Sequence, residues 1–168
     1  MKIGILGGSF DPAHKGHLAI SKEAKKRFKL EKIIWAVTKK NPLKAESKTP
    51  ISKKIKDCKK IIGMNSFIKV KFYENIIKSN KTIDLINYIK KNKNIEIFFL
   101  MGADNLINFH KWHKSKLISQ KCNIIVFDRH GYKKNSLKSK TFKRLNNKTL
   151  TFVEFKKVNI SSSQLRKI

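Results

Sequence analysis

The sequence GGSFDPAHKGH, residues 7–17, directly follows the apolar run IGIL of residues 3–6. The apolar run predicts a short buried strand, and the glycine pair predicts its end. Because Gly7 and Gly8 lack a Cβ atom, we expect a turn in which main-chain N–H groups surround an anion. A strand, a glycine turn and a following helix predict a phosphate site at the carboxyl end of a parallel strand.

Two histidines follow the glycine pair at a spacing of three residues, His14 and His17, with Gly16 between them. At the start of a helix, positions i and i+3 are neighbours, so both imidazoles would face one point. Gly16 would keep that point free of side-chain bulk. Taken singly, each part has an ordinary explanation, since a glycine pair is usually only a turn and a histidine is more often a surface or core residue. The complete string is much more specific than its parts.

The overall composition is that of one globular domain. The chain has 168 residues, of which 40% are apolar, so we expect a single domain over residues 1–168. No run of about eighteen apolar residues occurs, which argues against a membrane span, and the N-terminus has no signal-peptide pattern. Cys58 and Cys122 lack metal-ligand spacing. We therefore expect reduced thiols in a cytoplasmic protein.

The formal net charge of +29 raises the question of a polyanionic partner. The lysines are spread along the whole chain and do not alternate with aromatic residues as a base-stacking platform requires, so we expect no specific nucleic acid. Two explanations stay open: a positive field that attracts nucleoside triphosphates, and a solvated surface shaped by an AT-rich coding bias. The oligomeric state is also open, a homo-oligomer included.

Apolar runs alternate with helical periodicity along the chain. Residues 3–6, 17–29 and 32–38 form a strand–helix–strand unit, and the strongly apolar run 95–101 is typical of a central parallel strand. The pattern therefore predicts an α/β fold with a doubly wound, mainly parallel sheet of about five to six strands and helices on both faces. Further strands are expected at 67–72, 123–127 and 150–155, and helices at 47–64, from residue 79 onward, within a mobile surface region at 133–148, and at 160–166.

Polar residues follow several of these strands, where open α/β sheets bind ligands. Asp104 comes directly after the strand 95–101 and could accept a hydrogen bond from a ribose or an amide. Trp112 offers a flat face for a pyridine ring, although a tryptophan is more often a core residue. Ser79 and Thr82 are good N-cap residues for the helix that follows them.

The last segment, ISSSQLR at residues 160–166, reads as the start of a helix. Ser161 and Gln164 fit a capping box, and the free N–H groups of such a terminus, including those of Ser162 and Ser163, attract anions. Arg166 lies about one turn further and can bind a phosphate with two hydrogen bonds. Considered alone, the segment could equally be a plain cap beside a surface arginine.

Three strings together resemble one known family. Residues 7–17 resemble the signature of the nucleotidyltransferase superfamily that carries His-x-Gly-His, and most of all that of bacterial nicotinate-nucleotide adenylyltransferases. The strings GADNL at 102–106 and FHKW at 109–112 are similar to a second segment of this family, and residues 160–166 to a third. The resemblance implies a Rossmann-like fold and the reaction of ATP with nicotinate mononucleotide to give deamido-NAD and pyrophosphate.

The resemblance also implies which residues form the site, in three groups. The catalytic residues would be His14, His17 and Arg166. The phosphates of ATP would be bound by Gly7, Gly8, Ser9, Phe10, Gly16, Ser161, Ser162 and Ser163. The nicotinate nucleotide would be bound by Lys44, Thr82, Asp104 and Trp112.

The chain departs from the family pattern in three places. Residues 41–43 read NPL where the family has a second proline and a histidine before the basic residue that Lys44 matches. Lys81 replaces a tyrosine between Ser79-Asn80 and Thr82. His130 replaces a proline, so Arg129 is a weaker match than the other residues.

The chemistry expected of such a site is a direct in-line attack. The phosphate of the mononucleotide is already ionised, so the reaction needs charge neutralisation and alignment rather than a general base. We expect Mg²⁺ to arrive with ATP and no metal site made by the protein, because the sequence has no carboxylate cluster. The prediction requires the glycine turn with its two imidazoles and the helix of Arg166 to meet at one triphosphate.

Three alternatives remain open from the sequence. A phosphopantetheine adenylyltransferase or a cytidylyltransferase would share the first motif, although the segment around Asp104 and Trp112 argues against both. A non-enzymatic polyanion-binding protein would show tight, salt-sensitive binding and no turnover. An inactive member of the family is the third, and the presence of both histidines and Arg166 argues against it.

Overall fold

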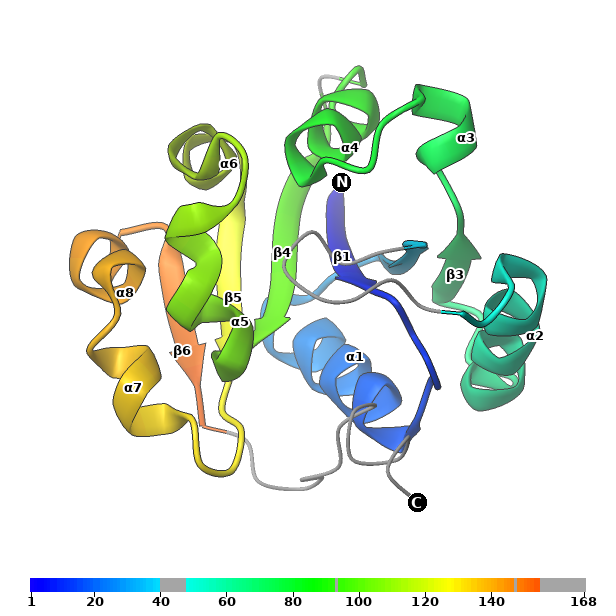
Figure 1. The fold of residues 1–168 in the computed structure, drawn as a ribbon, viewed down its shortest axis with the longest axis horizontal. Coiled ribbons are helices and arrows are strands. Elements are labelled where there is room, and N and C mark those ends of the chain that lie inside the picture. The colour runs from blue at the N-terminus through cyan, green and yellow to red at the C-terminus, as the bar shows by residue number, and fades with distance from the viewer. Residues whose placement is uncertain (40–47, 93, 147, 155–168) are drawn as a thin grey trace.

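The computed structural model describes residues 1–39, 48–92, 94–146 and 148–154. Six strands form one sheet in the order β3-β2-β1-β4-β5-β6, and every neighbouring pair is parallel (Figure 1). The predicted doubly wound α/β fold is therefore confirmed, with a fully parallel sheet. The strands are β1 (Lys2–Gly8), β2 (Lys32–Val37), β3 (Ile68–Lys71), β4 (Glu96–Gly102), β5 (Asn123–Phe127) and β6 (Leu150–Val153).

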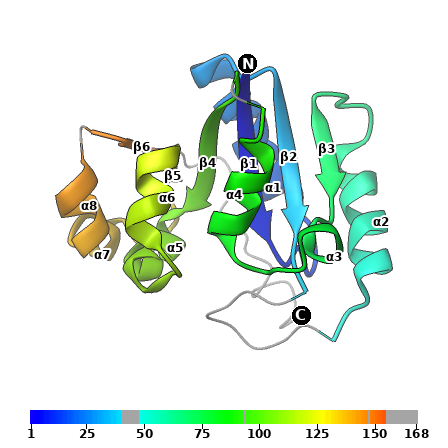
Figure 2. The ribbon, with the colours of Figure 1, turned by 90° about the horizontal axis from the view of Figure 1, so that it is seen from above.

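Helices cover both faces of the sheet (Figures 1 and 2). Apolar side chains of α1 and α2 pack with Trp35 and Leu100 on one face, and those of α4, α5, α6 and α8 pack with Ile34 and Phe99 on the other. Successive strand residues alternate between the two cores because side chains alternate across a strand. The helices are α1 (Lys15–Phe28), α2 (Ile51–Ile62), α3 (Glu74–Ile77), α4 (Thr82–Ile89), α5 (Ala103–Asn108), η1 (Phe109–Lys111), α6 (Ser115–Lys121), α7 (Lys133–Leu137) and α8 (Lys140–Leu145).

The strand order reverses at β1. The chain runs from β1 outward through β2 to β3, then crosses to β4 on the other side of β1 and continues outward to β6. In such sheets the ligand crevice lies outside the carboxyl ends of the two strands at the reversal. Here those strands are β1 and β4, so the segments after Gly8 and after Gly102 should border the site.

The glycine pair does not form the turn that the sequence suggests. Gly7 and Gly8 are the last residues of β1 and pair with Ala36 and Val37 of β2. The carbonyl of Gly8 also accepts the N–H of Thr38 at 3.0 Å. Pairing with β2 therefore extends the strand through both glycines, and the turn begins only at Ser9.

Two helical segments differ from their predicted form. Neither Ser79 nor Thr82 caps α4, because the N-cap residue is Lys81 and it makes no side-chain cap. The hydroxyl of Ser79 instead accepts the N–H of Lys81 at 3.1 Å and donates to Asp84 at 2.6 Å. The stretch 133–146 holds two short helices, α7 and α8, where one was predicted, and Leu145 packs into the core.

Within the described ranges, every helix is too short or too polar to cross a bilayer.

Candidate active site

The two predicted histidines lie in the first turn of α1. His14 is the N-cap residue, with extended backbone. Its Nδ1 accepts the N–H of Gly16 at 3.0 Å, while the Nδ1 of His17 accepts the N–H of His14 at 3.1 Å. This reciprocal arrangement is a capping box made by two imidazoles in place of the usual hydroxyl and carboxylate. The ring centroids are 4.0 Å apart, so the side chains converge as their spacing predicts.

Both imidazoles are neutral near neutral pH, and their ring hydrogens are on Nε2. The Nε2 position follows because each Nδ1 accepts a backbone N–H. Burial, and after it the positive charge of Arg129, lowers the pKa of His14 from 6.5 to about 4. Burial, then His14 and Arg129, holds the pKa of His17 well below 6.5. The pair therefore offers two neutral hydrogen-bond donors that do not repel each other.

The first turns of α1 are fixed to β2 by a chain of hydrogen bonds. Trp35 Nε1 donates to Ser21 Oγ at 2.8 Å, and Ser21 Oγ donates to the carbonyl of His17 at 2.8 Å. Trp35 and Ser21 are both fully buried. A buried polar network of this kind rigidifies the elements that it joins.

Phe10 supports the histidines rather than offering its ring to a ligand. Its side chain is 1% exposed and stacks on Trp35 with centroids 5.1 Å apart. The ring of His17 lies against it at 4.6 Å. Phe10 also has a positive φ of 48°, which is uncommon for a residue with a side chain. The expected contact of Phe10 with phosphate is therefore restricted to its backbone.

The amino end of α1 is suited to an anion. Its first turn carries no acidic residue, and its last turn carries Lys25, Lys26 and Arg27. The positive end of the helix dipole is thus not neutralised by a carboxylate of the same turn. Free N–H groups and a positive dipole end are the general features of anion sites at helix termini.

An ion pair lies on the neighbouring side of the crevice, at the ends of β4 and β5. Arg129 Nη1 donates to Asp104 Oδ2 at 2.7 Å, and both side chains are partly buried. Asp104 Oδ1 is buried and has no hydrogen-bond partner among the described residues. A buried acceptor without a partner costs about 1–3 kcal/mol, which is offset here by the ion pair of the same carboxylate with Arg129.

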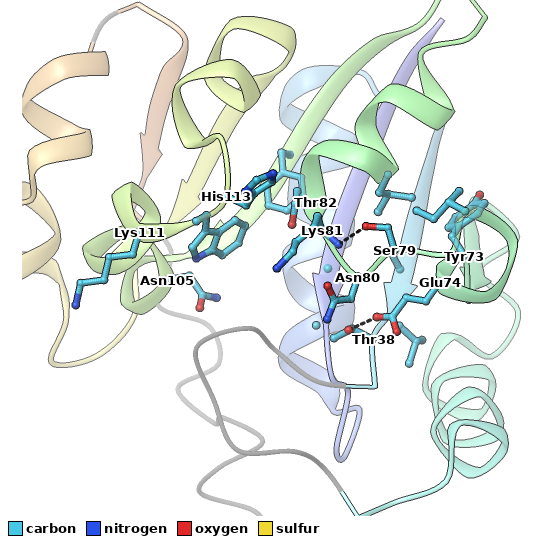
Figure 3. A pocket seen from close by; sticks show the side chains of 18 residues that line it. Thr38, Tyr73, Glu74, Ser79, Asn80, Lys81, Thr82, Asn105, Lys111 and His113 are labelled. Atoms are coloured by element: carbon cyan, nitrogen blue, oxygen red, sulfur yellow. Dashed lines mark hydrogen bonds between the residues drawn. The ribbon is translucent and has the colours of Figure 1, made fainter.

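A cavity of about 380 Å³ opens on the other face of the sheet, beside α4 and α5 (Figure 3). Four of the residues predicted for the site line it: Gly7, Gly8, Thr82 and Trp112. Trp112 packs partly on the core, edge-to-face with Phe99 at a centroid distance of 5.9 Å. Its indole is therefore both a core residue and a wall of the cavity.

The end of β1 separates the cavity from the histidines. The cavity is lined by Ala36 and Phe99, which belong to the core beneath α4 and α5, whereas Phe10 and Trp35 belong to the core beneath α1. Gly7 and Gly8 end the strand β1 at this edge of the described part of the chain, and both line the cavity. Because they have no side chains, a ligand can pass over the sheet edge from one side to the other.

Several predicted residues are not brought into this geometry. Asp104 does not line the cavity, although its neighbour Asn105 does. The N–H of Gly16 is taken by His14. Lys44, Ser161, Ser162, Ser163 and Arg166 lie outside the described residues. The predicted meeting of the histidines with the helix of Arg166 therefore stays a prediction.

Sequence reasoning missed residues whose roles depend on strand order. The Thr38 hydroxyl donates to Glu74 at the cavity wall. Thr38 follows β2 and Glu74 lies three residues after β3, so pairing those strands in parallel would have placed them together. Lys54 is buried in α2 and donates to the carbonyl of Thr38 at 3.1 Å. The sequence did not indicate this contact, because a lysine in an amphipathic helix is normally expected on the exposed face.

Comparison with known proteins agrees with this architecture. The model of the cytidylyltransferase-like family matches residues 5–168. The computed structure is also similar to the Plasmodium falciparum nicotinic acid mononucleotide adenylyltransferase complexed with NaAD, with a TM-score of 0.81 and 23% identity. The match covers 99% of this chain and 82% of that one. The family match and the fold thus define a nucleotidyltransferase of the α/β class.

Curated relatives narrow the family further. A protein of Pelagibacter ubique named "probable nicotinate-nucleotide adenylyltransferase" is 68% identical over 99% of this chain and 93% of its own length. A protein of Rhizobium johnstonii with the same name is 34% identical over 83% of this chain and 71% of its own length. The chain belongs to the nicotinate-nucleotide adenylyltransferase family.

Proposed function

We propose that this protein transfers the adenylyl group of ATP to nicotinate mononucleotide, which gives deamido-NAD and pyrophosphate. The observation that carries the proposal is the 68% identity to a nicotinate-nucleotide adenylyltransferase over almost the full length of both chains. The geometry supports it, because a helix end without acidic residues and a cavity with an aromatic wall lie at the same edge of the sheet.

The reaction needs alignment and charge stabilisation more than proton transfer. A phosphate oxygen of the mononucleotide attacks the α-phosphorus of ATP, and the bond from that phosphorus to the bridging oxygen of the β-phosphate breaks. The attacking oxygen is already ionised at neutral pH, so no general base is required. Negative charge moves toward the leaving pyrophosphate, and preorganised donors there lower the barrier.

His14 and His17 are the donors that we assign to this role. Their Nε2–H groups are not used by the capping box, and the two rings lie 4.0 Å apart, centroid to centroid, at the amino end of α1. Neutral imidazoles donate hydrogen bonds without the cost of burying two positive charges side by side. The backbone edge at Gly7 and Gly8 lets the phosphates lie close to the sheet.

The nicotinate nucleotide would occupy the cavity between α4 and α5. The pyridine ring would lie on Trp112 beside Thr82, and the carboxylate of Asp104, the neighbour of Asn105 in the cavity wall, would accept a hydrogen bond from a ribose hydroxyl. The acceptor phosphate would then reach over Gly7 and Gly8 toward the α-phosphate. This placement of the two substrates on opposite sides of the β1 end brings their reacting atoms together.

The remaining predicted residues belong to the same proposal. Arg166, with the N–H groups of Ser162 and Ser163 and the cap Ser161, would hold the β- and γ-phosphates. Lys44 would lie near the substrates from the loop after β2.

Magnesium enters the proposal as part of the substrate. Among the described residues, no group of three or more His, Cys, Asp or Glu side chains could hold a metal ion. In the proposal, Mg²⁺ is therefore bound by the phosphates of ATP and enters the site together with them. The bound ion would neutralise phosphate charge, while the two imidazoles orient the phosphate oxygens.

The function is tested by incubating the protein with ATP, Mg²⁺ and a panel of acceptors, and measuring pyrophosphate release. We expect release with nicotinate mononucleotide and background release with phosphopantetheine and with no acceptor. The same assay with CTP in place of ATP tests the cytidylyltransferase alternative. Release with nicotinate mononucleotide no higher than background would refute the proposal.

The role of His17 is tested by three substitutions that separate capping from donation. In His17→Asn the amide oxygen can still accept the N–H of His14, whereas the Nε2 donor is lost. We expect kcat to fall about a hundredfold, as for a lost oxyanion donor. His17→Ala removes cap and donor, and His17→Gln keeps a donor near the position of Nε2. Full activity in His17→Asn would show that the ring matters only for the cap.

A further inference from the structure

The wall of the cavity beside α4 carries charged side chains to which the proposed function assigns no role. Its lining includes Lys81 at the N-cap of α4, Lys111 at the end of η1, and Glu74 at the start of α3. The Glu74 carboxylate accepts a hydrogen bond from the hydroxyl of Thr38. The Glu74 carboxylate therefore already has a hydrogen-bond donor in Thr38.

The two lysines differ in direction. In Figure 3 the Lys81 side chain extends from the start of α4 toward Asn105 on the opposite wall, whereas Lys111 extends away from the other labelled side chains. Among the described residues, the Lys81 amine forms no ion pair, while its own N–H is held by Ser79 at 3.1 Å. The backbone is thus fixed and the amine is available to a ligand.

We propose that Lys81 is a specificity-determining residue, whose amine binds the pyridine carboxylate and so favours nicotinate over nicotinamide mononucleotide. The inference rests on the proposed function and names the group that recognises the carboxylate of the nicotinate ring. The two nucleotides differ by one negative charge on the ring substituent. Trp112 and Thr82, the residues assigned to the ring, line the same cavity as Lys81, so the wall that would hold the ring carries a cation.

Lys81 is one of the positions at which this chain departs from the resembled family pattern, which has a tyrosine there. An ammonium group discriminates a carboxylate from an amide by charge, which a neutral phenol does not. The substitution therefore adds a selective contact without altering Thr82 or the start of α4.

Lys81→Met tests the proposal, because methionine keeps much of the apolar stem and removes the charge. We measure dissociation constants by calorimetry and kcat/KM by pyrophosphate release, each for both nucleotides. The preference for the acid over the amide should fall about fivefold, the scale of a partly exposed ion pair. Lys81→Arg keeps the charge and should keep most of the preference. Lys78→Met is the matched control, since Lys78 is exposed in the same connection and does not line the cavity.

The outcomes separate this inference from the proposed function. Equal weakening with both nucleotides would overturn it, because the amine would then contact the ribose or phosphate that they share. An unchanged preference in Lys81→Met would overturn it as well. Failure of the proposed function would appear instead as a wild-type protein that neither binds nor adenylylates either nucleotide. Retained binding of the amide by Lys81→Met shows that the variant is folded.

Discussion

The two histidines at the start of α1 each do two jobs with their two ring nitrogens. Nδ1 closes the capping box, and this leaves Nε2–H as the donor that the box does not use. The same hydrogen bonds hold the rings at a centroid distance of 4.0 Å, where two imidazolium ions would repel each other. The lowered pKa of each histidine is consistent with this arrangement, because two neutral rings can lie this close whereas two charged rings would destabilise it.

This coupling predicts how stability depends on pH. The pKa of His14 is about 4 in the folded protein and 6.5 when unperturbed, so the unfolded chain takes up a proton first as the pH falls. The stabilisation is complete above pH 6.5 and is lost between pH 6.5 and about 4. Because the ring is partly exposed, we expect His14 to account for about 1–2 kcal/mol of that loss.

The measurement is urea unfolding at a series of pH values for the wild type and for His14→Asn, which keeps an acceptor for the N–H of Gly16. The variant should lose less stability than the wild type across this window. Identical pH profiles for the two proteins would show that His14 does not titrate as described. A second contribution from His17 would appear as residual pH dependence in the variant, since its pKa is also lowered by burial.

At the scale of the elements, tertiary contacts decided what local sequence could not. The glycine pair indicated a turn by its conformational freedom, yet pairing with Ala36 and Val37 makes it strand. Ser79 and Thr82 had the chemistry of helix caps, but the hydroxyl of Ser79 is used by Asp84. By contrast, long apolar runs such as 95–101 were placed almost to the residue, because burial on both faces leaves no competing structure.

The junction of α1 with β2 gives a prediction at this scale. Ser21→Ala removes the acceptor of the buried Trp35 N–H and the donor to the His17 carbonyl. Leaving the indole N–H without a partner should cost about 1–3 kcal/mol. Without these hydrogen bonds α1 is held less firmly against β2, and the histidines at its start are positioned less precisely. We therefore also expect kcat to fall while the KM for nicotinate mononucleotide changes little. Thermal unfolding and steady-state kinetics measure the two effects.

The control for that prediction is a double-mutant cycle with Trp35→Phe, which removes the orphaned donor itself. Once the indole N–H is gone, the serine substitution should cost less, so the two changes should not add. Additive costs would mean that the hydrogen bond between the two side chains is not the source of the destabilisation.

For the whole molecule, the sequence predicted the repeating strand and helix units but not their order in space. The apolar runs predict about five to six mainly parallel strands, and the crossover rule specifies the handedness of their connections. Nothing local specifies that the chain crosses over β1 between β3 and β4. That crossing brings the end of β4, with Asp104, to the end of β1, and it places the histidines and the cavity on opposite sides of Gly7 and Gly8. The resemblance to a family supplied this arrangement where periodicity could not.

The net charge of the whole molecule predicts how its thermal stability depends on salt. With a net charge of +29, self-repulsion in the compact state should exceed the attraction of the ion pairs, because those of the described part, such as Arg27–Glu23 and Lys53–Asp57, are mostly exposed. Raising sodium chloride from about 0.05 to 0.5 M shortens the screening length from roughly 14 to 4 Å. We therefore expect the melting temperature to rise by about 3 °C, equivalent to about 1 kcal/mol for a chain of this size.

Scanning calorimetry across a salt series measures this effect and separates it from anion binding at α1. Screening should raise the melting temperature gradually with ionic strength, and to the same extent in His17→Asn. Occupation of the anion site should instead saturate at low concentrations of added pyrophosphate and weaken in that variant, because the Nε2 donor is gone. A melting temperature that falls as sodium chloride rises would contradict this prediction. It would mean that attraction within ion pairs exceeds repulsion between lysines, so that surface electrostatics stabilise the fold.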